Sequence, residues 1–146
     1  MNNVLFTNGS DEILDYAFRA FCGPESPAAF ADVTYGFYKV FAQIHGVPYT
    51  EVPLREDFSL ALSDYDGVPG TVFIANPNAP TGMALARAEI EAFVSANPDR
   101  VIVVDEAYVD FGAESAVLMD VQTGAVLYAN SASAYYPVPE PEYDYR

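Results

Sequence analysis

Apolar side chains recur three or four positions apart in three segments of the chain, which is the spacing of one face of an α-helix. These positions are Leu14, Ala17, Phe18 and Phe21 in the first segment, Phe37, Val40, Phe41 and Ile44 in the second, and Ile90, Phe93 and Val94 in the third. Ser10 is a typical N-cap before the first segment, and Gly46 is a typical stop after the second. The pattern predicts three helices with these buried faces, the third over residues 84–97.

Short apolar runs without alternating polar positions lie between the helical segments. Residues 71–75 (TVFIA) and 101–104 (VIVV) are β-branched and apolar on both faces, which is typical of parallel strands covered by helices on both sides. Residues 28–33 and 47–52 are weaker strand candidates, and the prolines at 48 and 53 favour a short or edge strand for the second. The alternation predicts an α/β protein, a three-layer α/β/α sandwich with a mostly parallel sheet.

Charge and composition narrow the range of functions. The chain has 146 residues, the length of one domain, and a formal net charge of −15 from 21 acidic and 6 basic residues. Such a surface repels phosphate backbones and anionic lipids, so we expect no nucleic-acid and no membrane partner. Cys22 is the only cysteine, and neither a signal peptide nor a membrane-spanning run is evident. We therefore expect a cytoplasmic protein.

Two loops could hold a ligand, because ligands of parallel sheets bind at the carboxyl ends of the strands. Residues 8–12 (NGSDE) form a glycine-containing turn that opens a helix. Its free amides and the Ser10 hydroxyl could hold a phosphate, although a simple helix cap is the more common role of such a turn. Residues 76–82 (NPNAPTG) follow a buried strand and form a rigid turn, which is either purely structural or holds an asparagine amide for a ligand.

A carboxylate ends the apolar run at residues 101–104. Asp105 must be paired or hydrogen-bonded there, and a pyridinium nitrogen would suit it, as would a capping role for the next segment. Tyr108 lies three residues later and could donate a hydrogen bond to an oxygen of the same ring. Tyr35 opens the second helix and could stack on a flat ligand, or could simply be a packing residue.

The only histidine and the only lysine are not expected to be catalytic. His45 excludes a site built from several histidines, so we expect no metal site of that kind, and we expect it to cap the second helix. Lys39 lies in the middle of that helix and is expected to be solvated.

Five stretches in register resemble histidinol-phosphate aminotransferase, a fold-type-I enzyme dependent on pyridoxal 5'-phosphate (PLP). The resemblance covers about residues 2–115 and would make this region part of a PLP-binding large domain. The matching stretches are residues 8–12 (NGSDE), 34–38 (TYGFY), 76–82 (NPNAPTG), 104–111 (VDEAYVDF) and 112–115 (GAES).

The resemblance implies a role for each site residue. The amides of Ser10 and Asp11 would bind the cofactor phosphate, and Tyr35 would stack on the pyridine ring. Asp105 would pair with the ring nitrogen, and Tyr108 would bond the phenolic oxygen. In the family an asparagine often precedes the proline of the Pro-Thr-Gly turn and also bonds that oxygen. Here Ala79 occupies this position, so Asn78 is the candidate for that contact.

The implied reaction is amino transfer between histidinol phosphate and 2-oxoglutarate, in a homodimer. The family needs a lysine, in a Ser-Lys motif, that forms a Schiff base with PLP, and no lysine follows Lys39 in this sequence. A non-catalytic module that binds PLP or pyridoxamine phosphate weakly, or not at all, is therefore one alternative. Another is a related aminotransferase for aromatic amino acids or a phosphorylated amino alcohol.

The character of the sequence changes after Ser115. Residues 116–129 predict a β-hairpin, and residues 115–128 resemble the opening hairpin of serine D,D-carboxypeptidases without their catalytic Ser-x-x-Lys. Residues 130–146 are acidic and rich in proline, which predicts an extended or disordered tail.

Overall fold

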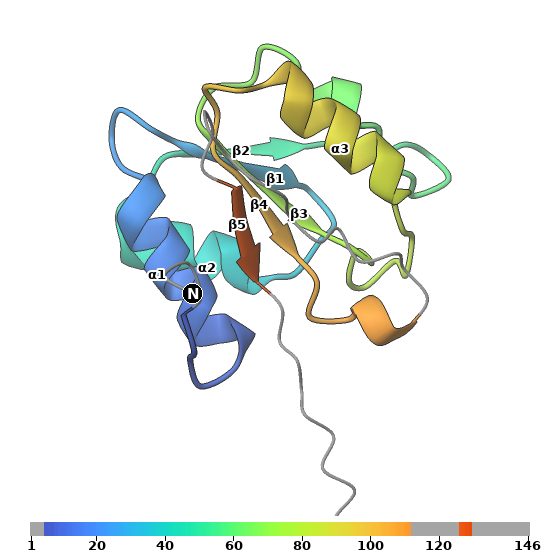
Figure 1. Cartoon of the computed structure of the whole chain (residues 1–146). Helices are drawn as coiled ribbons and strands as arrows, with labels where there is room; N and C mark the ends of the chain where they lie inside the picture. Colours follow the sequence, from blue (N-terminus) through green and yellow to red (C-terminus); the bar gives the residue numbers. More distant parts are fainter. Residues whose placement is uncertain (1–4, 112–125, 130–146) are drawn as a thin grey trace, which may run out of the picture.

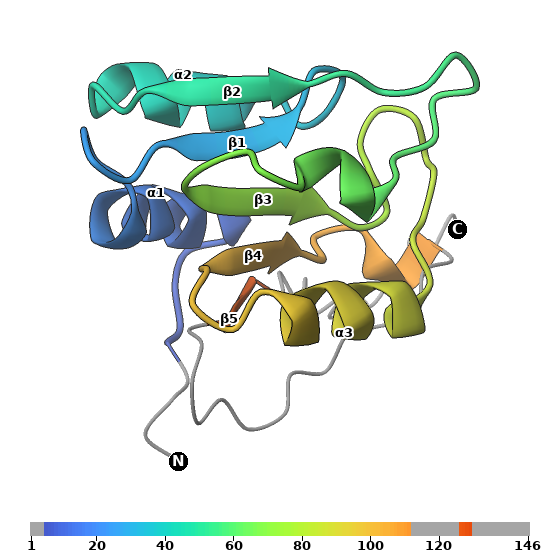
Figure 2. The same cartoon turned by 90° about the horizontal axis from the view of Figure 1, so that it is seen from above.

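Five parallel strands form one sheet in the computed structural model, which describes residues 5–111 and 126–129. The order across the sheet is β2-β1-β3-β4-β5, and each neighbouring pair is parallel (Figures 1 and 2). The strands are β1 (Ala28–Ala31), β2 (Tyr49–Val52), β3 (Thr71–Ala75), β4 (Ile102–Asp105) and β5 (Val126–Ala129). β2 lies at an edge and is four residues long, as its flanking prolines predicted.

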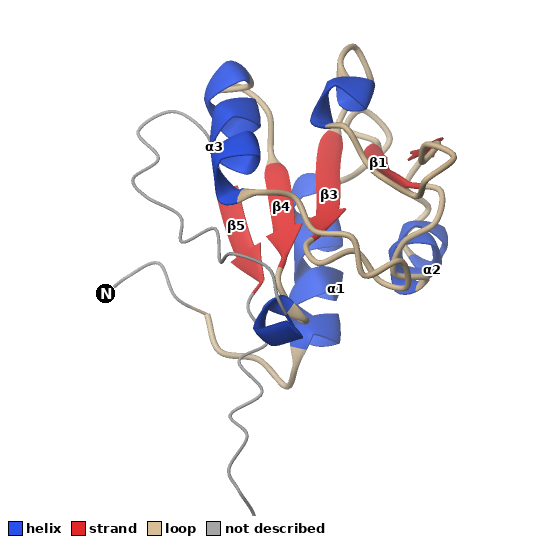
Figure 3. Cartoon of the chain, turned by 90° about the vertical axis from the view of Figure 1, so that its right-hand side faces the viewer, coloured by secondary structure: helices blue, strands red, loops and turns tan. Residues whose placement is uncertain are grey.

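Helices cover the sheet on both sides. They are α1 (Ser10–Phe21), α2 (Phe37–Ile44) and α3 (Arg87–Ala96), with 3₁₀ turns η1 (Leu62–Tyr65) and η2 (Val109–Phe111). α1 and α2 lie together on one side of the strands, and α3 lies on the other (Figures 1 and 3). The predicted three-layer α/β/α sandwich is confirmed for the described residues.

Two apolar cores flank the sheet because successive strand residues point to opposite faces. On the first face, Phe73 of β3 stacks on Phe18 of α1, with ring centroids 4.2 Å apart and an interplanar angle of 12°. On the second face, Ile74 of β3 packs in the cluster that contains Ile90 and Phe93 of α3. Every residue of β1, β3 and β4 is buried, which is why these runs carry no polar alternation.

The buried face of α2 differs from the predicted one. Tyr38, Phe41 and Ala42 are buried, whereas Val40 and Ile44 are exposed. The helix is apolar over most of its circumference, so periodicity alone allowed two faces. In the orientation that α2 adopts, the buried Tyr38 hydroxyl donates a hydrogen bond to Asp105.

The ends of the other two helices also differ slightly from expectation. Ser10 is the first residue of α1, and Gly9, with φ of 83°, takes the N-cap position. α3 begins at Arg87 rather than near residue 84, because Leu85 exchanges two hydrogen bonds with the Asn76 side chain and is held outside the helix. Both differences depend on backbone and side-chain contacts that periodicity does not report.

The segment of the predicted hairpin is described only in part. Val126–Ala129 forms β5, which pairs in parallel with β4 as a strand of the main sheet. The first strand and the turn of the predicted hairpin, and the predicted tail at residues 130–146, lie outside the described residues.

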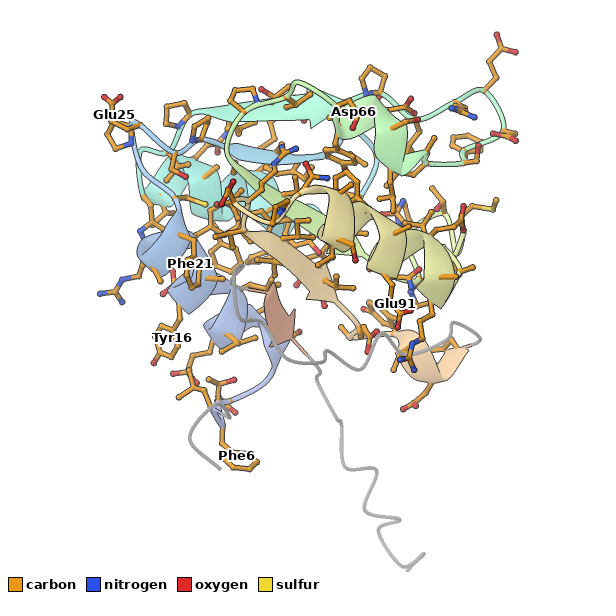
Figure 4. The ribbon with its side chains drawn as sticks, turned by 45° about the horizontal axis from the view of Figure 1, so that its top comes forward. Phe6, Tyr16, Phe21, Glu25, Asp66 and Glu91 are labelled. Carbon is orange, nitrogen blue, oxygen red and sulfur yellow. The ribbon has the colours of Figure 1, made fainter. Side chains whose placement is uncertain are left out.

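Several polar and charged side chains form contacts on the outer surface of the fold. His45 follows α2, and its Nε2 lies 2.6 Å from Asp15 Oδ1 of α1. Lys39 is exposed and donates to Glu51 Oε1 at 3.0 Å. Figure 4 shows Glu25, before β1, and Glu91, on α3, at separate places on the surface. No helix in the described part of the chain is both long enough and apolar enough to cross a membrane.

Candidate functional site

The carboxyl ends of the central strands and the start of α1 enclose a pocket. β1 and β3 are neighbours, but the chain leaves β1 toward β2 and leaves β3 toward β4. Their carboxyl ends are therefore a topological switch point, where the loops diverge and leave room for a ligand. The pocket is lined by Ser10, Tyr35, Ala75, Pro77, Ala79, Asp105, Ala107 and Tyr108.

Four of the six predicted cofactor-binding residues line this pocket: Ser10, Tyr35, Asp105 and Tyr108. Asp11 adjoins it, because its Oδ1 accepts a 2.6 Å hydrogen bond from the Tyr35 hydroxyl. These residues come from α1, the loop after β1, and the end of β4 with the turn that follows. The fold thus brings together residues that lie almost a hundred positions apart in the sequence.

Asp105 is a buried carboxylate at the end of β4, with only 5% of its surface exposed. Its Oδ2 accepts a 2.8 Å hydrogen bond from the Tyr38 hydroxyl, and its Oδ1 accepts the Ala107 N–H at 3.1 Å. Burial raises the pKa of Asp105, and these two donors oppose that rise. A buried carboxyl whose remaining acceptor capacity meets a pocket is suited to a cationic N–H partner.

The raised pKa of Asp105 predicts how stability depends on pH. The Asp105 carboxyl holds its proton more tightly in the folded chain than in the unfolded chain. This contribution to the free energy of unfolding is therefore complete below the ordinary carboxyl pKa, and it is lost as the pH rises through the folded-state pKa. The slope for one proton is at most about 1.4 kcal/mol per pH unit.

Asp105→Asn removes this titration, so its stability relative to the unmodified chain should increase as the pH rises. Urea unfolding of both proteins from about pH 3 to about pH 8 measures the difference, and the other carboxylates cancel in the comparison. Stability curves that run parallel over this range would contradict the assignment.

Tyr35 is held on one wall of the pocket from two sides. Its hydroxyl donates to Asp11, and its ring contacts the rings of Phe37 and Tyr38 at centroid distances of 5.7 Å each. Burial, followed by the hydrogen bond to Asp11, raises the pKa of the Tyr35 phenol, so the ring stays neutral. A neutral aromatic ring fixed in this way offers a face on which a planar ligand can stack.

The first turn of α1 forms another part of the pocket. α1 is 12 residues long, and within the described residues no side chain caps its first turn. The backbone amides there can donate hydrogen bonds to an anion, and the positive end of the helix dipole favours a negative charge at this position. The Ser10 hydroxyl lies on the same pocket wall.

Asn78 does not line this pocket. Its amide nitrogen donates to the Val33 carbonyl and to the Thr81 hydroxyl, and its oxygen accepts from Thr34. These bonds tie the loop after β3 to the loop after β1, and both amide hydrogens are used. Asn78 therefore shapes the pocket rim, and Ala79 is the residue of this turn that enters the pocket beside Pro77.

A second cavity adjoins the first along the same loop. Its lining consists of Pro77, Asn78, Ala79, Pro80, Gly82, Tyr108 and Phe111. Tyr108 lines both cavities and is 48% exposed.

Comparison with protein-family models gives a match over most of the chain. The family model described as aminotransferase class I and II matches residues 1–136. The chain belongs to this aminotransferase family. The match reaches beyond residue 115, where the sequence resemblance described above stops, and it includes the segment that forms β5.

Curated relatives of this aminotransferase chain include two bacterial histidinol-phosphate aminotransferases. The protein from Acinetobacter baumannii (strain ATCC 17978) is 52% identical over 117 residues, which are 80% of this chain and 32% of that protein. Histidinol-phosphate aminotransferase 1 of Burkholderia pseudomallei (strain K96243) is 54% identical over 114 residues, 78% of this chain and 32% of that protein. The chain thus spans about a third of the length of the curated relatives that it matches.

A solved structure has the same fold as this aminotransferase chain. The histidinol-phosphate aminotransferase from Sinorhizobium meliloti, in complex with pyridoxal-5'-phosphate, aligns with a TM-score of 0.74 at 23% identity. The alignment covers 87% of this chain and 37% of that one.

Sequence reasoning missed one residue that contacts the pocket lining. Tyr38 was part of the TYGFY stretch but received no role, and its helix was assigned another buried face. The available signal was its position three residues after Tyr35, which places both side chains on the same side of a helix start. Its partner Asp105 lies 67 positions away, so only the fold connects the two.

Proposed function

We propose that this chain is the cofactor-binding part of a PLP-dependent aminotransferase that transfers an amino group between histidinol phosphate and 2-oxoglutarate. The observation that carries the proposal is the buried Asp105 carboxylate in a pocket that also contains the Tyr35 ring and the start of α1. The names of the similar curated proteins support this choice of amino donor. A homodimer is proposed for the complete protein.

The residues present fit PLP in three respects. PLP carries a phosphate, a flat aromatic ring and a basic ring nitrogen. The first turn of α1 with Ser10 suits the phosphate, Tyr35 suits the ring, and Asp105 suits a protonated nitrogen. Each part of the cofactor thus has a partner of complementary chemistry in one pocket.

Each residue would then have a definite task. When bound, PLP supplies a protonated ring that withdraws electrons from the reacting carbon of the substrate. Ionised Asp105 would hold the proton on the ring nitrogen, and Tyr35 would stack on the ring face. Tyr108 would donate to the phenolic oxygen, while Ser10 and the amides of Ser10 and Asp11 would bind the phosphate. Asn78, with its amide hydrogens already used, would hold the loop in place instead of contacting the ring.

We assign no residue of this chain to the Schiff base with PLP. Lys39 is the only lysine, and it is exposed on α2 in an ion pair with Glu51, away from the pocket lining. We therefore assign the Schiff-base lysine to sequence beyond these 146 residues, in keeping with the 32% coverage of the relatives. For the chain by itself, the lysine count favours a second candidate function, cofactor binding without turnover.

The proposal is tested by thermal unfolding with pyridoxamine phosphate, which needs no lysine for binding. At 100 times its dissociation constant, the ligand should stabilise the folded chain by about 2.7 kcal/mol. Asp105→Ala should abolish most of this gain, because the ring nitrogen loses its partner. Asp66→Ala, at an exposed position after η1, is the matched control and should retain the gain. A cooperative melt that the ligand leaves unchanged would refute cofactor binding by this chain.

A further inference from the structure

A tyrosine hydroxyl is buried directly behind the pocket. Tyr38 of α2 is 0% exposed, and its ring is surrounded by the rings of Phe30, Tyr35 and Phe73 at centroid distances of 5.6–5.8 Å. Its hydroxyl reaches through this apolar layer to Asp105 Oδ2 at 2.8 Å. Apolar contacts alone would be served as well by phenylalanine, so the hydroxyl needs a separate explanation.

We infer that Tyr38 is a positioning residue for the cofactor site: it fixes the Asp105 carboxylate and keeps it ionised for the ring nitrogen. This inference rests on the proposed function for the identity of the ligand. The contact between Tyr38 and Asp105 is a property of this chain alone, so it can be tested without any ligand.

The charges around Asp105 explain why it needs such a donor. Asp11 of α1 and the adjacent Glu106 both raise the pKa of Asp105, in addition to the larger effect of burial. Tyr35 and Tyr38 also interact with it and are neutral phenols whose pKa values are raised, and Tyr108 lines the same pocket. None of the ion pairs in the described part of the chain involves Asp105. Hydrogen bonds, from Tyr38 first and then Ala107, are what oppose its protonation.

The two donors also fix the orientation of the carboxylate. Tyr38 takes one oxygen and the Ala107 amide takes the other, so rotation about the last side-chain bond would break both bonds. Because each oxygen can accept more than one hydrogen bond, acceptor capacity is left for a group in the pocket. A second donor behind a ligand-binding carboxylate is a common way to orient it.

The test measures the Asp105 pKa directly, by ¹³C NMR of aspartate side chains in the 146-residue chain without ligand. Tyr38→Phe should raise the pKa of Asp105 above its value in the unmodified chain, because the largest opposing donor is removed. Tyr65→Phe is the matched control. Tyr65 is also 0% exposed, but its hydroxyl has no hydrogen-bond partner among the described residues, and it lies in the core on the other face of the sheet. An unchanged Asp105 pKa in Tyr38→Phe would overturn the inference.

A second measurement connects this effect to the ligand. Binding of pyridoxamine phosphate should weaken as the pH falls and Asp105 gains its proton. In Tyr38→Phe this loss should begin at a higher pH than in the unmodified chain or in Tyr65→Phe. A raised Asp105 pKa in Tyr38→Phe without ligand binding by any variant would support the Tyr38 contact and overturn the proposed cofactor. Binding with the same pH dependence in all three proteins would overturn the positioning role.

A further variant covers the case in which Tyr38→Phe does not fold. Replacement of Tyr38 by 3-fluorotyrosine keeps the hydroxyl and the ring shape, and makes the phenol a stronger donor. The Asp105 pKa should then fall below that of the unmodified chain. A value that stays the same or rises would overturn the inference.

Discussion

Gly70→Ala is expected to destabilise the fold severely. A Cβ atom at Gly70 would overlap the carbonyl oxygen of Pro27, and the backbone there has φ of +90°, which side chains rarely adopt. The same Pro27 oxygen accepts the Thr71 N–H at 2.8 Å, so the clash falls where β1 and β3 begin to pair. The cost should exceed about 4 kcal/mol, a large part of the stability of a small domain. Urea unfolding followed by circular dichroism measures it.

Gly67→Ala is the matched control for this prediction. Gly67 also has a positive φ, of +75°, but a Cβ atom there would meet nothing within 4 Å. Its substitution should cost only the backbone strain, about 1–2 kcal/mol. Similar stabilities for the two variants would show that the approach of Pro27 to Gly70 is not the constraint that the structure indicates.

Phe73→Ala is expected to lower the free energy of unfolding by about 3–5 kcal/mol. Phe73 is 1% exposed in the centre of β3, stacked on Phe18 and 5.6 Å from the Tyr38 ring. Its removal would leave a cavity under both α1 and α2, and the strand backbone cannot move to fill it. Because Tyr38 loses a neighbour, the Asp105 contact should loosen as well. Urea unfolding measures the stability, and the NMR titration measures the site.

Phe6→Ala provides the reference for the loss of a phenylalanine outside the core. Phe6 is 92% exposed and extends away from the fold (Figure 4), so its substitution should change stability by no more than about 0.5 kcal/mol. A Phe73→Ala variant as stable as Phe6→Ala would contradict the assignment of Phe73 to the core.

A strong overall negative charge is compatible with an anionic cofactor because the site depends on local groups. The chain carries a net charge of −15, and Asp11 lies in the first turn of α1, where the phosphate is proposed to bind. The Asp11 carboxylate is engaged by the Tyr35 hydroxyl, and the adjacent amides point out of the helix start. For the proposed cofactor, hydrogen bonds at short range would outweigh a surface charge that solvent ions screen.

Much of the fold follows from the sequence alone. Apart from Thr71, the runs at residues 71–75 and 101–104 are apolar, which is typical of strands buried on both faces. Once these strands are parallel, their carboxyl ends must meet at one edge. That rule directed attention to the loops after the strands, and the family resemblance implied that Tyr35 and Asp105 contact the same ring. The structure shows both residues together with Ser10 and Tyr108 in one pocket.

Other features were decided only by the tertiary structure. α2 is apolar on nearly all sides, so its buried face depends on contacts made by Tyr38 with residues distant in the sequence. Asn78 likewise donates a hydrogen bond to the Val33 carbonyl in the loop after β1, about 45 positions away, which requires the two loops to meet. The local hydrophobic pattern indicates which secondary structure a segment can form, because propensity and periodicity act within a few residues. It cannot report which distant donor reaches a buried carboxylate, since that distance exists only after the layers have packed.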